Sequence, residues 1–236
     1  MKKRKTPLVE AVKRKTLSEE VIDHIIQLLI DGTLKPGDKL PSEVELSEML
    51  SVSRPVLREA MSSLDSLGMI HRKTRGGTYF SKKIGSRPFS IMLALSAGDI
   101  VEIVESRMAL ELGLVTLAAE NITAEELDTL SQTIEKMSVK QKGYTKYDRE
   151  FHRIIALSGS RTIFEGMVDA ILTAFDKTLS EIKEKEHETT LKHHRNIYQA
   201  LKKRSPMEAF THMYEHMNFV RHRILTAFHK NTGESE

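Results

Sequence analysis

The amino-acid sequence predicts a mostly α-helical protein of two parts: three helices with a β-hairpin, followed by an antiparallel all-α bundle. Two observations support this prediction. Apolar residues recur at helical spacing through most of the chain, whereas β patterns occur only near residues 69–72 and 78–81. Turn signals separate the later helical segments at short intervals, and helices joined by short loops pack antiparallel. The length of 236 residues allows two modest domains.

Composition excludes several classes of protein. The chain has no cysteine, which rules out disulfides and thiolate metal sites. No apolar run approaches the roughly 20 residues that a membrane span needs. The basic N-terminus lacks the apolar segment of a signal peptide. We therefore expect a cytoplasmic protein with no membrane partner.

The net charge of +3 conceals an asymmetry between the two parts. Residues 1–85 hold 16 Lys and Arg against 11 Asp and Glu, whereas the remainder holds 20 against 22. Many of these bases fall in residues 1–15, which predict a flexible basic arm. A basic N-terminal third suits a polyanion partner, although an ordinary solvated basic face would give the same count.

Residues 16–82 predict the first domain. Its first helix covers about 18–30, where isoleucine, leucine and valine form a broad apolar face. Ser42, with Glu45 three residues on, predicts a capping box at the start of a second, short helix. Ser53 is expected to cap a third helix.

A hairpin tip at Arg75, Gly76 and Gly77 completes this domain, because glycine takes the positive φ that a tight turn needs. Three helices followed by a hairpin is the order of a winged helix-turn-helix. Arg75 at the tip is placed to reach a minor groove or a phosphate. The N-terminal part of the third helix would enter the major groove.

The third helix carries Ser53, Arg54 and Arg58 near its start. The two arginines are four residues apart, so they share one helix face. Arginine at such a position reads guanine or binds phosphate. Solvated arginines without a ligand remain the alternative at this point.

An ordered set of motifs runs through this domain: Gly32-x-Leu34-x-Pro36-Gly37-x-x-Leu40-Pro41-Ser42-Glu43, then Val52-Ser53-Arg54-x-x-x-Arg58-Glu59-Ala60, then Leu67-Gly68 and Gly77-Thr78. The set resembles the GntR family of bacterial regulators. The resemblance implies a winged helix-turn-helix that binds a palindromic DNA operator as a homodimer, with Arg54 and Arg58 contacting DNA and Gly76-Gly77 in the wing. One departure is Val44, where the family usually has a DNA-contacting arginine.

Residues 83–90 predict a linker, and residues 91–230 predict the helical bundle. Breaks in the pattern include Ser158-Gly159-Ser160 and Ser205-Pro206. The expected helices cover about 98–120, 123–139, 144–157, 161–184, 187–203 and 206–229.

Four side chains of the bundle predict a metal site. Asp148 and His152 are four residues apart and project from one helix face. His194 and His216 each lie 11 residues from the Ser205-Pro206 break. In an antiparallel hairpin they stand at matching heights, about 16 Å from the turn.

Three imidazoles and one carboxylate suit zinc, nickel, manganese or iron better than calcium, with zinc favoured. His193 and His212 are rival ligands.

The same half of the chain resembles the FCD domain of FadR-type GntR regulators over roughly residues 98–225. The motifs are Glu105-x-Arg107-x-x-x-Glu111, Leu117-Ala118-Ala119, Asp148-x-x-x-His152, His194-Arg195-x-Ile197, Ala209 and His216. The resemblance implies a bundle of six or seven helices with a central metal held by Asp148, His152, His194 and His216.

The resemblance also points Arg107 into the metal cavity, where it would bind a small carboxylate effector such as a hydroxy- or keto-acid. An ion pair with Glu105 or Glu111 on its own helix is the alternative. We expect a ligand-responsive transcription regulator, a repressor of metabolic genes, and no enzyme. A metal-dependent hydrolase with an appended DNA-binding domain, or a purely structural zinc site, are the rival interpretations.

Overall fold

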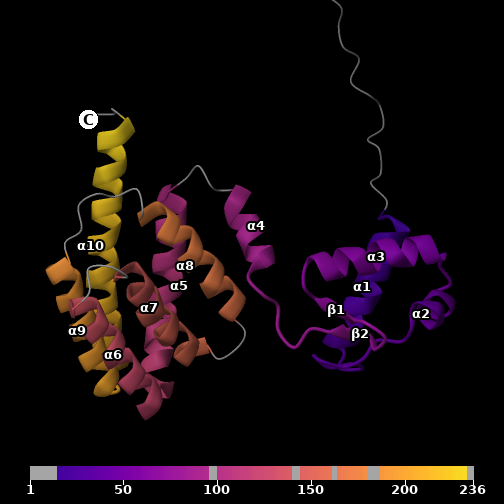
Figure 1. The fold of residues 1–236 in the computed structure, drawn as a ribbon, viewed down its shortest axis with the longest axis horizontal. Helices are drawn as coiled ribbons and strands as arrows, with labels where there is room; N and C mark the ends of the chain where they lie inside the picture. The colour runs from indigo at the N-terminus through magenta and orange to yellow at the C-terminus, as the bar shows by residue number, and fades with distance from the viewer. Residues whose placement is uncertain (1–14, 96–99, 140–143, 161–163, 180–186, 233–236) are drawn as a thin grey trace, which may run out of the picture. The chain divides into compact units, whose positions relative to one another are not determined.

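The computed structural model describes residues 15–95, 100–139, 144–160, 164–179 and 187–232 (Figure 1). The chain divides into two compact units, Met1–Ile84 and Gly85–Glu236. The described residues form helices and one β-hairpin, which confirms the mostly α-helical class. No helix in the described ranges is long and apolar enough to cross a membrane. The basic arm predicted over residues 1–15 lies outside the described residues except for its last residue.

The first unit contains three helices followed by a two-stranded hairpin, as predicted. Its elements are α1 (Leu17–Ile30), α2 (Glu43–Met49), α3 (Arg54–Ser66), β1 (Ile70–Lys73) and β2 (Gly77–Phe80). The strands pair antiparallel, with Ile70 opposite Phe80 and Lys73 opposite Gly77. The core joins all three helices to the hairpin through buried side chains that include Ile25, Leu46, Leu57, Met61 and Phe80.

Helix caps in this unit follow the sequence prediction in part. Ser42 and Glu45 form the predicted capping box of α2. Ser53 occupies the N-cap position of α3, but its side chain makes no capping bond, so that detail was wrong. A capping side chain accepts from the amide of the second or third helical residue. Pro55 is the second residue of α3 and has no such amide, which removes one of the two donors.

The second unit contains seven helices in its described part. They are α4 (Arg87–Leu95), α5 (Ile100–Asn121), α6 (Ala124–Val139), α7 (Tyr144–Ser160), α8 (Glu165–Leu179), α9 (His187–Lys202) and α10 (Pro206–Thr232). Helix α10 packs against α5 and α9, and α7 packs against α5, α6 and α8 (Figure 1). A buried apolar cluster fills the interior between α5, α6, α7, α9 and α10. The bundle therefore encloses side chains that face inward from these helices.

Two features of this unit differ from the sequence prediction. Helix α4 was not predicted, and it begins inside the segment 83–90 that we expected to be a linker. The predicted break at Ser158-Gly159-Ser160 is instead the last turn of α7. Of the predicted helix 161–184, residues 161–163 and 180–184 lie outside the described residues, and α8 covers 165–179.

Gly159 allows a close crossing of two helices. A Cβ atom built at this position would lie 2.3 Å from the backbone oxygen of Leu114 and 3.1 Å from the backbone nitrogen of Ala118, both on α5. Backbone atoms cannot rotate away as a side chain can. The glycine in the last turn of α7 is therefore required by packing between α7 and α5.

Gly159→Ala is expected to destabilise the second unit, because α5 and α7 have to move apart. Overpacking of this kind costs about 1–3 kcal/mol. Gly113→Ala on α5 is the matched control, since Gly113 is exposed and its added Cβ meets nothing within 4 Å. The control is expected to be neutral or to gain up to about 1 kcal/mol of helix propensity. Urea unfolding midpoints measure both changes, and equal midpoints for the two variants would contradict the packing argument.

Candidate functional site

Three histidines from three different helices meet in the interior of the bundle. His152 lies on α7, His194 on α9 and His216 on α10, and all three are at most 1% exposed. Each offers one ring nitrogen such that the three nitrogens lie within 4.8 Å of one another. The ring centroids of His194 and His216 are 4.7 Å apart, as expected for residues at matching heights on paired helices.

Asp148 completes the group that the sequence predicted. It lies one turn before His152 on α7 and is buried. Its Oδ1 atom is 3.5 Å from Nε2 of His194, and Nε2 of His152 is 3.2 Å from Nε2 of His216. The structure therefore brings the three predicted histidine ligands together and places Asp148 next to one of them, His194.

Burial favours the neutral, metal-binding form of two of the three histidines, His194 and His216. Burial is the largest cause that lowers the pKa of His194 and of His216 well below the ordinary value, and nearby cationic groups, including Arg107, add to it. A neutral imidazole keeps a lone pair for a metal. Burial raises the pKa of Asp148, while His152 and Arg107 oppose the rise.

The ring nitrogen Nε2 of His194, which lies nearest Asp148, is buried without a hydrogen-bond partner in the described part of the chain, so its lone pair is free for a cation. Among the described residues, both ring nitrogens of His194 and Nδ1 of His216 are buried without a hydrogen-bond partner. Buried polar atoms are normally paired, because an unpaired one costs its desolvation energy. Three imidazole nitrogens and a carboxylate are a donor set that suits a divalent transition ion.

The rival histidines have other surroundings. His212 on α10 bonds to Glu215, with Nδ1 and Oε2 3.0 Å apart. His193 on α9 packs its ring edge-on against Phe219, and neither His193 nor His212 belongs to the nitrogen cluster.

Arg107 and Glu111 form a buried ion pair beside the cluster. Nε of Arg107 donates to Oε1 of Glu111 at 2.5 Å, and the guanidinium carbon lies 3.9 Å from the ring centroid of Phe175. Oε2 of Glu111 contacts Nδ1 of His152. Burial alone would raise the pKa of Glu111, but Arg107 and His152 outweigh it and hold the value at about 2.

This pair is the alternative that the sequence left open for Arg107. Glu111 was not predicted as a site residue. The only local signal was its spacing of four residues from Arg107, which predicts an ion pair on one helix face. This spacing does not predict the contact of Glu111 with His152 on α7.

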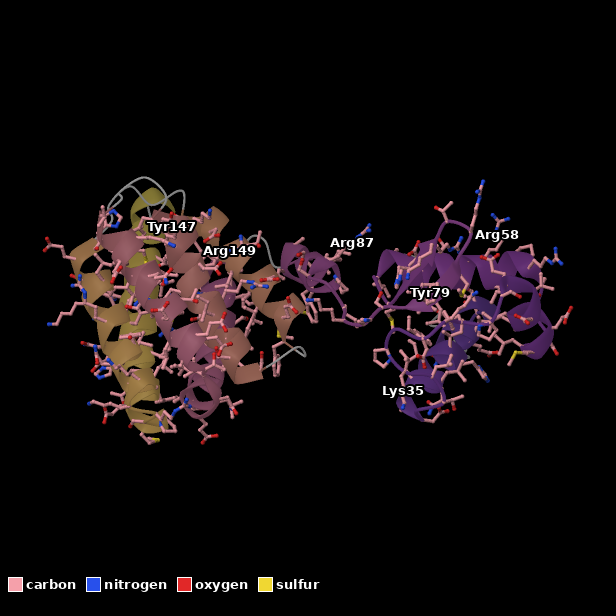
Figure 2. All side chains as sticks on the ribbon, turned by 60° about the horizontal axis from the view of Figure 1, so that its bottom comes forward. Lys35, Arg58, Tyr79, Arg87, Tyr147 and Arg149 are labelled. Atoms are coloured by element: carbon pink, nitrogen blue, oxygen red, sulfur yellow. The ribbon has the colours of Figure 1, made fainter. Side chains whose placement is uncertain are left out.

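The predicted DNA-reading arginines lie on the solvent face of α3. Leu57, Ala60 and Met61 bury the opposite face, while Arg54 and Arg58 are exposed. Within the described residues no carboxylate forms an ion pair with either guanidinium. Figure 2 shows Arg58 pointing away from the rest of the first unit. The helix therefore presents two cations to a partner.

The hairpin tip has the backbone of a tight turn. Gly77 takes a φ of 96°, and Arg75, rather than Gly76, is the second tip residue with positive φ, at 60°. Arg75 is exposed. Next to the hairpin, Arg72 of β1 pairs with Glu43 of α2 at 3.3 Å, which ties the wing to the helix that carries Val44. Val44 is 45% exposed.

Comparison with known proteins places both units in described families. Residues 17–80 match "Bacterial regulatory proteins, gntR family", and residues 102–219 match the "FCD domain".

The chain is 54% identical over 218 residues to the HTH-type transcriptional regulator YcbG of Bacillus subtilis, covering 92% of this chain and 94% of that protein. It is 29% identical to the HTH-type transcriptional regulator LutR of the same organism, over 86% of this chain and 99% of LutR. It is 28% identical to the HTH-type transcriptional repressor NanR of Klebsiella aerogenes, over 88% of this chain and 85% of NanR.

A solved structure, Streptococcus agalactiae GntR, superposes with a TM-score of 0.62 at 25% identity. It covers 87% of this chain and 99% of that one.

Proposed function

The chain belongs to the GntR family of bacterial regulatory proteins and carries an FCD domain, and from this premise we propose that it is a repressor that releases DNA when it senses a small organic acid. GntR regulators of this type are DNA-binding transcription regulators whose FCD domain binds the effector. The NanR relatives are described as repressors, which supports repression over activation. Because its target is chromosomal DNA, we place its action in the cytoplasm.

The observation that carries the proposal is the convergence of Asp148, His152, His194 and His216 inside the bundle. These residues would hold one divalent transition ion, with zinc favoured over nickel, manganese or iron. Such an ion, when bound, would supply open coordination positions for the oxygens of a small organic acid. Asp148 and the three imidazoles hold it deep in the bundle and shield it from bulk water.

Arg107 supports an anionic effector. Its guanidinium is close enough to lower the pKa of His194 and His216, so its positive charge acts on the same interior. The bond to Glu111 uses Nε, and an arginine has further N–H donors that suit a carboxylate. We propose that these donors bind the carboxylate of a hydroxy- or keto-acid.

The DNA-binding part of the proposal uses Ser53, Arg54 and Arg58 on α3 and the tip Arg75-Gly76-Gly77. One winged helix offers few base contacts, so useful genomic specificity needs two copies. We propose a homodimer that reads a palindromic operator with one α3 in each half-site. Effector binding would shift the population of the dimer toward a state with lower DNA affinity.

A metal-dependent hydrolase would use the same cluster differently. The relatives are transcription regulators, which normally are not enzymes, and we propose that this chain is not one. Removal of the metal separates the interpretations. A sensor loses its effector response, a hydrolase loses turnover, and a structural site loses its fold.

The full-length protein tests the proposal on an operator selected from random DNA. Glycolate, pyruvate and gluconate serve as hydroxy-acid, keto-acid and sugar-acid probes. We expect two chains per operator and release of DNA by at least one probe class. We also expect the effective probe to raise the thermal midpoint only while the metal is present, because a ligand stabilises the state that it binds. A probe that releases DNA equally well from chelator-treated protein would contradict the role of the metal.

A further inference from the structure

Glu111 is a buried carboxylate that touches the histidine cluster without belonging to the proposed ligand set. It lies on α5 and is 4% exposed. Its two oxygens have different partners, since Oε1 accepts from Arg107 on the same helix and Oε2 contacts Nδ1 of His152 on α7. The carboxylate therefore joins α5 to one specific nitrogen of one proposed ligand.

The position of the proton in the contact between Glu111 and His152 follows from the chemistry of the two side chains. An ionised carboxylate only accepts hydrogen bonds, so the contact requires a proton on Nδ1 of His152. When the ring carries a single proton and that proton is on Nδ1, the lone pair is on Nε2. Nε2 is the atom that lies 3.2 Å from Nε2 of His216, inside the cluster.

His152 differs in this respect from the other two histidines. Nδ1 of His194 and Nδ1 of His216 have no hydrogen-bond partner among the described residues. Of these three histidines, His152 is thus the one whose Nδ1 contacts a carboxylate, that of Glu111. Arg107 holds that acceptor in turn, and the guanidinium lies against the ring of Phe175.

From this geometry we infer that Glu111 is a positioning residue, which locks His152 in the Nδ1–H tautomer and aims Nε2 at the metal. The inference rests on the proposed metal centre and specifies how one of its ligands is prepared. A carboxylate partner also raises the basicity of the ligating nitrogen, and losing such a partner typically costs about 10–100-fold in metal affinity.

Nitrogen NMR of the wild-type protein tests the tautomer directly. In metal-free, full-length protein with 15N-labelled histidine, Nδ1 of His152 is expected to carry the proton and Nε2 to be unprotonated. Nδ1 should remain protonated after zinc is added. A proton on Nε2 in the metal-free protein would overturn the inference. This measurement needs no variant, so it stands even if substitutions at Glu111 prevent folding.

Zinc affinity of variants provides the second test. Glu111→Gln is expected to bind zinc about 10–100-fold more weakly than wild type in competition with a fluorescent chelator. Glu105→Gln is the matched control, because Glu105 lies on the same helix and also pairs with an arginine, Arg221, at 2.5 Å, but on the surface. The control should keep wild-type affinity.

The outcomes separate this inference from the proposed function. Wild-type protein that binds no zinc would refute the proposed metal centre, while the NMR result would still show whether Glu111 sets the tautomer. Wild-type protein that binds zinc, with an unchanged affinity in folded Glu111→Gln, would refute the inference alone.

Discussion

Replacing both Arg54 and Arg58 with alanine is expected to weaken specific operator binding strongly while the protein keeps its fold. Both side chains leave the solvent face of α3, so their removal leaves the buried face of the helix intact. Each arginine that contacts DNA contributes about 1–3 kcal/mol. For two such residues the combined loss is at least about 30-fold in affinity. Fluorescence anisotropy with the selected operator measures it.

Lys35→Ala is the matched control for this prediction. Lys35 is an exposed cation of the same unit, and in Figure 2 it lies on the opposite edge of that unit from Arg58. A duplex docked on α3 therefore leaves Lys35 without a contact, and the control should bind as wild type does. The salt dependence of binding shows whether an arginine contacts a phosphate or a base. Loss of a phosphate contact reduces the slope of affinity against salt concentration, whereas loss of a base contact does not. A double variant with the wild-type footprint at moderate salt would show that α3 does not read DNA.

Helical periodicity predicted most of the bundle because its helices bury one face against their neighbours. The predicted helices 98–120 and 187–203 correspond to α5 at 100–121 and α9 at 187–202. Helix α4 escaped prediction although its sequence is apolar, because it is short and its first residues fall in the segment that we expected to be a linker. In the structure α4 packs against α8, and its Leu93 lies against a buried apolar cluster that includes Leu114 and Val168, although no residue of α4 is itself buried.

The convergence of the proposed metal ligands was predictable because local spacing fixed their positions on the helices. The interval of four between Asp148 and His152 places them on one face, and the equal distances of His194 and His216 from the turn place them at one height. Glu111 had no such signal, since its contact with His152 joins residues 41 apart in the chain. The packing role of Gly159 had no local signal either, because it depends on the backbone of α5.

Replacing His194 or His216 with alanine is expected to abolish metal binding. Elemental analysis of protein purified without a histidine tag should show about one divalent ion per chain in wild type and none in either variant, because each variant removes one of three clustered imidazoles. Circular dichroism should show retained helices. Loss of helix on metal removal would instead favour the structural zinc site.

His193→Ala and His212→Ala are the controls, and both are expected to keep the ion. Adjacent residues on a helix differ by about 100° in direction, so His193 and His194 project from different faces of α9. A comparison of His193→Ala with His194→Ala therefore reports which face of α9 holds the metal. The opposite result would be retention of the ion in His194→Ala and its loss in His193→Ala. It would mean that the ligand on α9 is His193, one residue away from the proposed one. The arrangement of Asp148, His152 and His216 around His194 would then not be the metal centre.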